Sequence, residues 1–328
     1  MNRRRFLIAG SVLPAIASMR AALGQTKRPP VLIGWLNTGS QKINGHFLAA
    51  FKDGMEELGR REGTHFVLEA HWGEGRLERL PALAKQLAVK KPAVIVAATN
   101  HAVAAAAKAA PTTPIVQATG GDPVIAGFAA SLARPGGMIT GLTNLGSDLN
   151  VKFIELLVSI APKIRRVGFL VDSTVYMRKQ VLESGRRSAA QHSIDARFEE
   201  AGKPEEIEPA LARLAKQGVQ GLIVTTGPMF VPERQRILDF ATARRWPVVA
   251  GGSGWADAGC LLSYGIDGAA NYRRAASYVD RILKGAKPGD LPIEQPTKIE
   301  LVINRKVAKA FGLTIPQELI LRADRVIE

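Results

Sequence analysis

The chain has 328 residues, which exceeds one average domain and predicts two domains of about 150 residues each. Hydrophobic residues make up 46% of the sequence and the mean hydropathy is +0.03, which excludes an intrinsically disordered chain and a protein embedded in the membrane. The net charge of +15 raises the question of nucleic-acid binding, but Lys and Arg are dispersed over amphipathic helices without a continuous basic run, which argues against it.

Residues 1–24 have the features of an export signal. Three arginines precede an apolar segment at residues 6–17, and the small residues Ala22 and Gly24 occupy the −3 and −1 positions of a cleavage site. The arginines favour the twin-arginine route, and the Sec route is the alternative. The apolar segment is shorter than the roughly 20 residues of a membrane-spanning helix. We therefore predict a cleaved signal peptide and a periplasmic product that begins at Gln25.

Strand and helix patterns alternate from residue 31 to residue 144. Expected strands lie at 31–37, 65–72, 93–99, 114–119 and 138–144, and expected helices lie at 46–59, 76–90, 100–110 and 123–133. The runs 93–99 and 114–119 lack polar alternation, so we expect them to be buried on both faces of a parallel sheet. This pattern predicts a doubly wound α/β lobe, whose ligand crevice lies beyond the carboxyl ends of its strands.

The same alternation resumes after residue 147. Expected strands lie at 165–173, 195–201, 221–227, 247–252, 261–265 and 297–304, and expected helices lie at 150–162, 176–191, 204–218, 231–245, 271–285 and 305–312. The predicted fold class is α/β, with two doubly wound parallel-sheet lobes joined by a multi-strand hinge. We assign residues 29–143 and 265–287 to an N-terminal lobe and residues 144–264 and 288–328 to a C-terminal lobe. The hinge crossings are expected near 143–147, 264–267 and 287–296.

Motifs for catalysis, nucleotide binding and metal binding are incomplete. The loop 251–255 lacks the final glycine of a nucleophile elbow, and the loop after the first strand lacks both the dinucleotide pattern and a Walker lysine. The single cysteine, Cys260, excludes an internal disulfide and a multi-thiolate metal site. His65 and His71 share one face of a predicted strand, which we attribute to the strand surface rather than to a metal. No cofactor, metal ligand or catalytic residue is assigned.

Short polar side chains and several aromatics follow the predicted strands. Hydroxyls, amides and loop N–H groups at such places can hold a carboxylate, and aromatic rings can cover an apolar part of a ligand. The expected ligand contacts are Asn37, Thr38, Thr99, Asn100, Thr119, Gly120, Asp122, Asp172, Tyr176, Thr225, Trp255 and Tyr264. Asp122 precedes a proline and is also a good helix N-cap, so capping and ligand contact are both open roles for it.

Three blocks of sequence carry a specific resemblance: PIVQATGGDPVIAGFAASLARPGGMITGLT (114–143), WADAGCLLSYGIDGAANYRRAASYVDRILKGAKPGDLPIEQPTKIELVINRKVAKAFGLTIP (255–316) and LRADRVIE (321–328). The chain resembles bacterial ABC-transporter substrate-binding proteins of the tryptophan/tyrosine type, a periplasmic-binding-protein-like group of type I, over nearly its whole mature length. The resemblance implies a receptor whose two lobes close over a small molecule and deliver it to a membrane permease and ATPase, without catalysis. It places the ligand site at 34–38, 99–100, 119–122 and Tyr264.

The family often has Asn-Pro-x-Asn after the first strand of the second lobe, and residues 172–176 depart from that pattern. The expected ligand is a small carboxylate-bearing compound, either an amino acid or an aromatic acid. Loop groups at Thr99, Thr119 and Gly120 would hold the carboxylate, Asp122 would hold an ammonium, and second-lobe aromatics would cover the ligand. A monomer is expected. The alternatives are a periplasmic ligand sensor and, on the same lobes, a periplasmic enzyme, for which the motifs provide no catalytic set.

Overall fold

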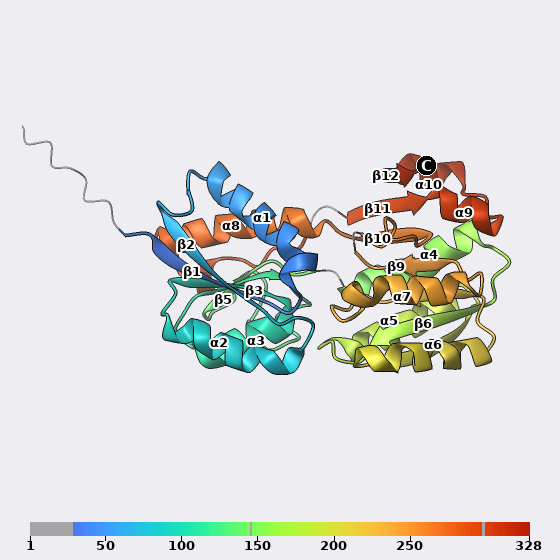
Figure 1. Cartoon of the computed structure of the whole chain (residues 1–328), viewed down its shortest axis with the longest axis horizontal. Coiled ribbons are helices and arrows are strands. Elements are labelled where there is room, and N and C mark those ends of the chain that lie inside the picture. Colours follow the sequence, from blue (N-terminus) through green and yellow to red (C-terminus); the bar gives the residue numbers. More distant parts are fainter. Residues whose placement is uncertain (1–28, 145, 253, 297–298) are drawn as a thin grey trace, which may run out of the picture.

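A computed structural model describes residues 29–144, 146–252, 254–296 and 299–328, except for the side chains of 146–148 and 150. The strands form two separate sheets, one of five strands and one of seven, and each sheet lies in its own lobe (Figure 1). This arrangement confirms the predicted α/β class with two lobes. The expected signal peptide, residues 1–24, lies outside the described residues.

The first lobe is built on a five-stranded parallel sheet in the order β2-β1-β3-β4-β5. Its strands are β1 (Val31–Asn37), β2 (Phe66–Trp72), β3 (Val94–Ala98), β4 (Ile115–Thr119) and β5 (Ile139–Gly141). The helices that cover it are α1 (Gln41–Glu57), α2 (Leu80–Val89), α3 (Thr99–Ala109) and α8 (Gly268–Leu283).

Strand β3 explains why this sheet is covered on both faces. All five of its residues are buried, as the unbroken apolar run predicts. Because successive side chains point to opposite faces, Val94, Val96 and Ala98 pack in one cluster with α1 and α8. Ile95 and Ala97 pack in the other cluster with α2 and α3.

The second lobe contains a seven-stranded sheet in the order β12-β11-β10-β9-β8-β6-β7. Its strands are β6 (Arg166–Asp172), β7 (Asp195–Ala201), β8 (Gly221–Val224), β9 (Val248–Ala250), β10 (Leu262–Ile266), β11 (Ile299–Asn304) and β12 (Arg325–Ile327). Its helices are α4 (Gly146–Ile160), α5 (Arg178–Gln191), α6 (Ile207–Lys216), α7 (Phe230–Thr242), α9 (Arg305–Phe311) and α10 (Gln317–Arg322). Short 3-10 turns at Leu77–Arg79 and Pro204–Glu206 lead into α2 and α6.

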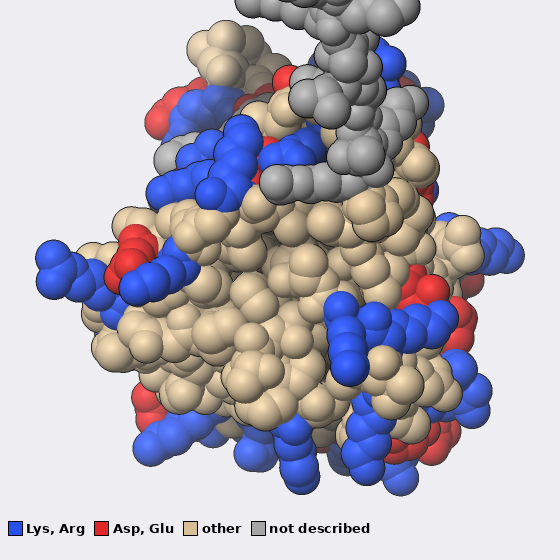
Figure 2. All heavy atoms as spheres, turned by 90° about the vertical axis from the view of Figure 1, so that its left-hand side faces the viewer, with Lys and Arg blue, Asp and Glu red and all other residues tan. Residues whose placement is uncertain are grey.

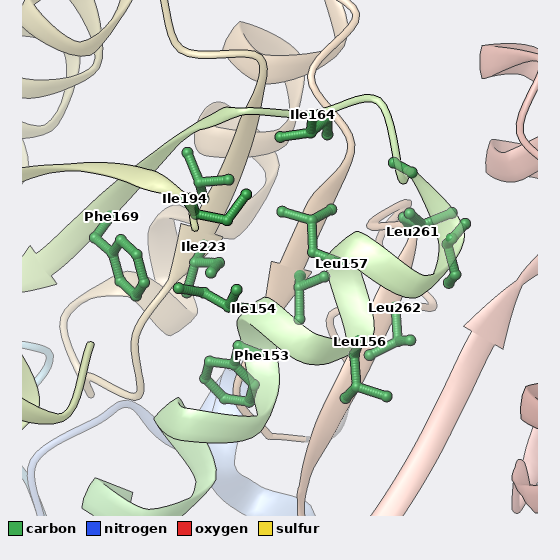
Figure 3. Close-up of a cluster of buried hydrophobic side chains, with 14 of the residues drawn as sticks. Phe153, Ile154, Leu156, Leu157, Ile164, Phe169, Ile194, Ile223, Leu261 and Leu262 are labelled. Carbon is green, nitrogen blue, oxygen red and sulfur yellow. The ribbon is translucent and has the colours of Figure 1, made fainter. Parts of the chain in front are cut away.

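Helix α4 anchors the core of the second lobe. Its residues Phe153, Ile154 and Leu157 are fully buried, and they point toward Phe169 of β6 and Ile223 of β8 (Figure 3). On the other face of the sheet, α6 and α7 cover a second apolar cluster. Each sheet is therefore sandwiched between helices, as a doubly wound lobe requires.

The second sheet is not wholly parallel, which corrects the sequence prediction. Strand β11 runs antiparallel to β10, and β12 pairs in parallel with β11. The reason is topological. The chain leaves the second lobe at the carboxyl end of β10, which faces the first lobe, and continues into α8 there. It then re-enters the second lobe at this same end of the sheet. The next strand, β11, must therefore run in the opposite direction.

The helix expected at residues 123–133 does not form. The Asp122 carboxylate accepts hydrogen bonds from the N–H groups of Val124 (2.7 Å) and Ile125 (3.2 Å) and so begins a helical turn. Gly127 then adopts a left-handed conformation at φ 75°, which ends the turn after one revolution. The local signals for a helix start were correct, but the glycine stops it. The short elements α10 and β12 were not predicted.

The chain passes between the lobes three times: from β5 to α4, from β10 to α8, and after Glu294 toward β11. Residues 288–294, which the sequence assigns to the C-terminal lobe, pack on the N-terminal lobe instead. The Thr140 hydroxyl donates to the Leu291 carbonyl at 2.7 Å, the Tyr278 hydroxyl donates to the Pro292 carbonyl at 2.7 Å, and Arg274 pairs with Glu294. The last crossing therefore begins after Glu294, because these bonds hold the preceding segment.

The basic residues do not gather in a single patch on the exposed end of the first lobe. Figure 2 shows Lys and Arg side chains at the margin of a broad uncharged area on this face, several of them beside Asp or Glu. Many pair with acids, as Arg273 does with Asp53 and Glu57. No helix among the described residues combines the length and the apolar character needed to cross a bilayer.

Candidate functional site

A cavity of about 1130 Å³ lies between the two lobes, at the carboxyl ends of β1, β3, β4, β8 and β9. This is the place where doubly wound sheets bind ligands, because the loops of several strands converge there. The first lobe lines it mainly with polar loops, and the second lobe adds apolar and aromatic groups.

Two buried asparagines from the first lobe present free amide donors to the cavity. Asn37 is 2% exposed, and its Oδ1 accepts a hydrogen bond from the Gly39 N–H at 2.8 Å. Asn100 is 5% exposed, and its Oδ1 accepts from the Gly121 N–H at 2.6 Å. These bonds fix the amide orientations, and both Nδ2 atoms are buried without a hydrogen-bond partner among the described residues. Both side chains therefore offer donors to an acceptor in the cavity.

Thr99 is held in a strained conformation at the same wall. Its φ of 74° lies in the left-handed region, which is unfavourable for a β-branched residue. Its hydroxyl is buried without a hydrogen-bond partner among the described residues. Thr99 also begins α3, and no side chain caps this helix. The uncapped N–H groups and the positive end of the helix dipole make this a favourable place for a negative charge. Strain of this kind concentrates at functional sites.

An aromatic wall of the first lobe adjoins these donors. The rings of Phe47 and Tyr272 stack with their centroids 4.7 Å apart, and both residues line the cavity. Trp35 supports Tyr272 from behind at 5.3 Å. Burial raises the pKa of the Tyr272 hydroxyl well above its usual range, so Tyr272 stays neutral. This wall suits an aromatic or apolar ligand group.

The second lobe lines the cavity with apolar side chains and a few polar ones. Trp255 is 3% exposed and packs in the core of its lobe while one side lines the cavity. The hydroxyl of Thr226 is buried without a hydrogen-bond partner among the described residues. Among the described residues of this lobe that line the cavity, Arg234 from α7 is the one with a permanent positive charge.

The lobes touch one another beside the cavity. The His101 ring from α3 meets the Tyr176 ring edge to face at 4.9 Å, and it hydrogen-bonds the backbone of Thr174. The Asp122 N–H donates to the Met177 sulfur at 3.2 Å. Burial lowers the pKa of His101 below its ordinary value of 6.5, although the Thr174 bond and the charge of Asp172 act in the opposite direction. This contact therefore favours neutral His101.

Eight of the twelve residues predicted as ligand contacts line the cavity: Asn37, Thr38, Thr99, Asn100, Thr119, Gly120, Tyr176 and Trp255. The remaining four do not. The Asp122 carboxylate caps a turn, and Asp172 is buried, with its carboxylate accepting bonds from Thr174 and the Met229 N–H. These two acids are structural, so the ammonium role expected for Asp122 is revised.

The other two residues do not reach the cavity, each for its own reason. The Thr225 hydroxyl donates to the Leu170 carbonyl at 3.2 Å, and it is the next residue, Thr226, that lines the cavity. Tyr264 packs against the core of the second lobe, and Ile266, two residues later, lines the cavity. Neighbouring side chains of an extended segment point to opposite sides, so position alone does not tell whether Thr225 or Thr226 faces the crevice. Tyr264 shares a strand face with Ile266 but lies farther from the carboxyl end of β10.

Sequence reasoning missed several lining residues, among them Phe47, Met177, Arg234 and Tyr272. Phe47 and Tyr272 lie in helices whose apolar pattern is typical of core packing, so no local signal separates them from core residues. Arg234 could have been found, because it lies near the start of the helix that follows a predicted strand end, a position near the crevice.

The described residues contain no group of histidines, cysteines and acids suited to a metal ion. Cys260 is fully buried, and burial raises the pKa of its thiol, so it is not activated as a nucleophile. The buried polar groups of the first-lobe wall are amide donors and hydroxyls. This arrangement is suited to holding a ligand.

Comparison with known proteins agrees with this geometry. The family model "ABC transporter substrate binding protein" matches residues 45–327. A tyrosine-binding protein of Clostridioides difficile is 24% identical over 264 residues, which cover 80% of this chain and 75% of that protein.

Solved structures show the same fold. The ABC domain from Streptococcus pneumoniae in complex with L-Trp superposes with a TM-score of 0.85 at 22% identity, covering 91% of this chain and all of that one. A conserved domain protein from Vibrio cholerae superposes with a TM-score of 0.85 at 24% identity, covering 90% of this chain and 99% of that one. Because the family model spans most of its length, the chain belongs to the family of ABC transporter substrate-binding proteins, which are binding proteins rather than enzymes.

Proposed function

We propose that this protein captures a small carboxylate-bearing ligand, an amino acid or an aromatic acid, between its two lobes in the periplasm and delivers it to the permease and ATPase of an ABC importer. The observation that carries the ligand class is the set of donors in the first-lobe wall. The free amides of Asn37 and Asn100 and the uncapped start of α3 are all suited to an anionic acceptor. The stacked rings of Phe47 and Tyr272 suit an aromatic group.

The similar proteins support the same class of ligand. One relative is a tyrosine-binding protein and one structural neighbour holds L-Trp, and both ligands join a carboxylate to an aromatic side chain. The N-terminal sequence supports export, with cleavage before Gln25. Binding and release require the lobes to move, and we propose the three crossings between them as the hinge.

A thermal-shift screen with amino acids and aromatic carboxylates tests this proposal. Ligand at about 100 times Kd should stabilise the protein by roughly 2.7 kcal/mol, which raises the melting midpoint by about 5–10 °C. The variant Asn100→Asp keeps an oxygen to accept the Gly121 N–H but replaces the free donor by a negative charge. It should abolish the shift.

The matched control is Gln191→Glu, which adds the same charge at an exposed residue at the end of α5. It should leave the shift unchanged. Stabilisation by sugars or cations alone, with every carboxylate inactive, would refute the ligand class. An equal response of both variants would show that the first-lobe donors do not bind the carboxylate.

A further inference from the structure

Arg234 is a half-buried cation on the second-lobe side of the cavity, and nothing described above uses its charge. It lies in α7, which follows the carboxyl end of β8. Side chains in a helix lean toward the helix N-terminus, so Arg234 reaches back toward the cavity, which it lines. Its guanidinium rests over Gly254, since a Cβ added there would lie 3.3 Å from its Nη1. The charge is thereby placed beside Trp255.

Within the described ranges, Arg234 makes no hydrogen bond and no ion pair, which sets it apart from its neighbours on α7. Arg236, two residues later, bonds Glu208, Glu233 and the Pro204 carbonyl. Helix α7 and the loop beneath the Arg234 guanidinium also contribute the apolar residues Val231, Pro232 and Trp255 to the cavity lining. A guanidinium has five N–H donors and a permanent charge. An anion that enters the cavity would therefore be the strongest partner for Arg234.

A structural role in neutralising Asp257 does not account for this arrangement. Asp257 also lines the cavity, but both of its oxygens are bonded by Arg325, at 2.7 Å each. Arg325 is the main influence that lowers the pKa of Asp257, and Arg234 is the smallest one. Glu74 is the other carboxylate in the lining, and it lies exposed on the first lobe. Neither acid is therefore a dedicated partner of Arg234.

From this placement we infer that the ligand carries a second anionic group, bound by Arg234, in addition to the carboxylate held by the first-lobe donors. The inference rests on the proposed function and narrows it. The cavity offers anion donors on both lobes, and the aromatic residues Phe47, Tyr272 and Trp255 also line it. The chemical class that fits is an aromatic dicarboxylate, which would draw the two lobes together because each lobe holds one of its charges.

Isothermal titration calorimetry on the mature protein, with benzoate and the three benzenedicarboxylates as probes, tests the inference. The dicarboxylate of matching geometry should bind at least about 10-fold more tightly than benzoate. The variant Arg234→Gln should lower the affinity for that dicarboxylate by about 10- to 100-fold, which is the contribution of a charge-assisted hydrogen-bond pair. It should change the affinity for benzoate by less than about threefold. The variant Arg234→Lys should recover part of the loss, because it keeps the charge without the planar fork.

Arg236→Gln is the matched control, because it removes the same charge from the same helix while its side chain bonds acids outside the cavity. It should leave both affinities unchanged. If benzoate or L-tryptophan binds but no dicarboxylate is tighter, or if Arg234→Gln leaves the ratio of dicarboxylate to benzoate affinity intact, the inference fails and the proposed function stands. If no carboxylate binds the wild-type protein and a sugar does, the proposed function itself fails.

Discussion

Replacing Thr99 by glycine should stabilise the ligand-free protein and weaken ligand binding at the same time. Thr99 has a φ of 74° and lines the cavity at the start of α3. The left-handed conformation costs a residue with a Cβ about 1–2 kcal/mol, and glycine adopts it freely. A β-branched side chain makes the conformation less favourable still.

The size of the effect follows from two opposing terms. Removing the Cβ recovers about 1–2 kcal/mol of strain, and the greater freedom of glycine in the unfolded chain takes back about 0.5–1 kcal/mol. The net gain of about 1 kcal/mol corresponds to a rise in melting midpoint of about 2–4 °C for a lobe of roughly 150 residues. The lost hydroxyl bond to a carboxylate should weaken binding by about 10- to 100-fold.

Differential scanning calorimetry and titration with L-tryptophan or benzoate measure the two quantities. Thr99→Ala should lose affinity like glycine but gain less stability, because it keeps a Cβ. Lys91→Gly is the control for strain, since exposed Lys91 has a φ of 52° just after α2 and lies outside the cavity lining. It should gain stability without changing affinity. A Thr99→Gly protein that melts below the wild type, or that binds both acids with unchanged affinity, would refute the assignment of functional strain at this residue.

Three further outcomes are expected. Asp122→Ala should lower stability by about 1 kcal/mol in urea unfolding, because its carboxylate caps a turn, and a changed ligand affinity would restore a binding role. Because burial depresses the pKa of His101, its contribution to stability is intact above pH 6.5 and is lost as the pH falls from there toward the lowered value; the wild type should lose more stability between pH 7.5 and 5.5 than His101→Gln, and parallel curves would contradict this. Small-angle scattering should show a smaller radius of gyration with saturating ligand, and identical profiles would argue against hinge closure.

Local chemistry in the sequence determined the order and position of most elements. The apolar run at β1 predicts the bounds that the structure has, and those at β3 and β4 predict theirs to within one residue at either end, because a strand buried on both faces needs uninterrupted apolar residues. The bounds of β7, a partly exposed strand with charged residues, were also predicted. Small polar residues after these strands also located the cavity, since parallel strands end at one edge of a sheet. Asn37, Thr99, Asn100 and Thr119 were found in this way.

Tertiary structure decided what depends on direction and on distant partners. The reversal of β11 follows from the return of the chain from the first lobe, and the choice of Thr226 over Thr225 follows from how β8 sits against its neighbours. The Asp122 carboxylate caps a turn and lies outside the cavity lining, which residue type and strand position alone could not reveal. Periodicity reports whether a residue is buried. It does not tell which residues pack against the buried side chain, because these residues come close only when strands and helices far apart in the chain pack together.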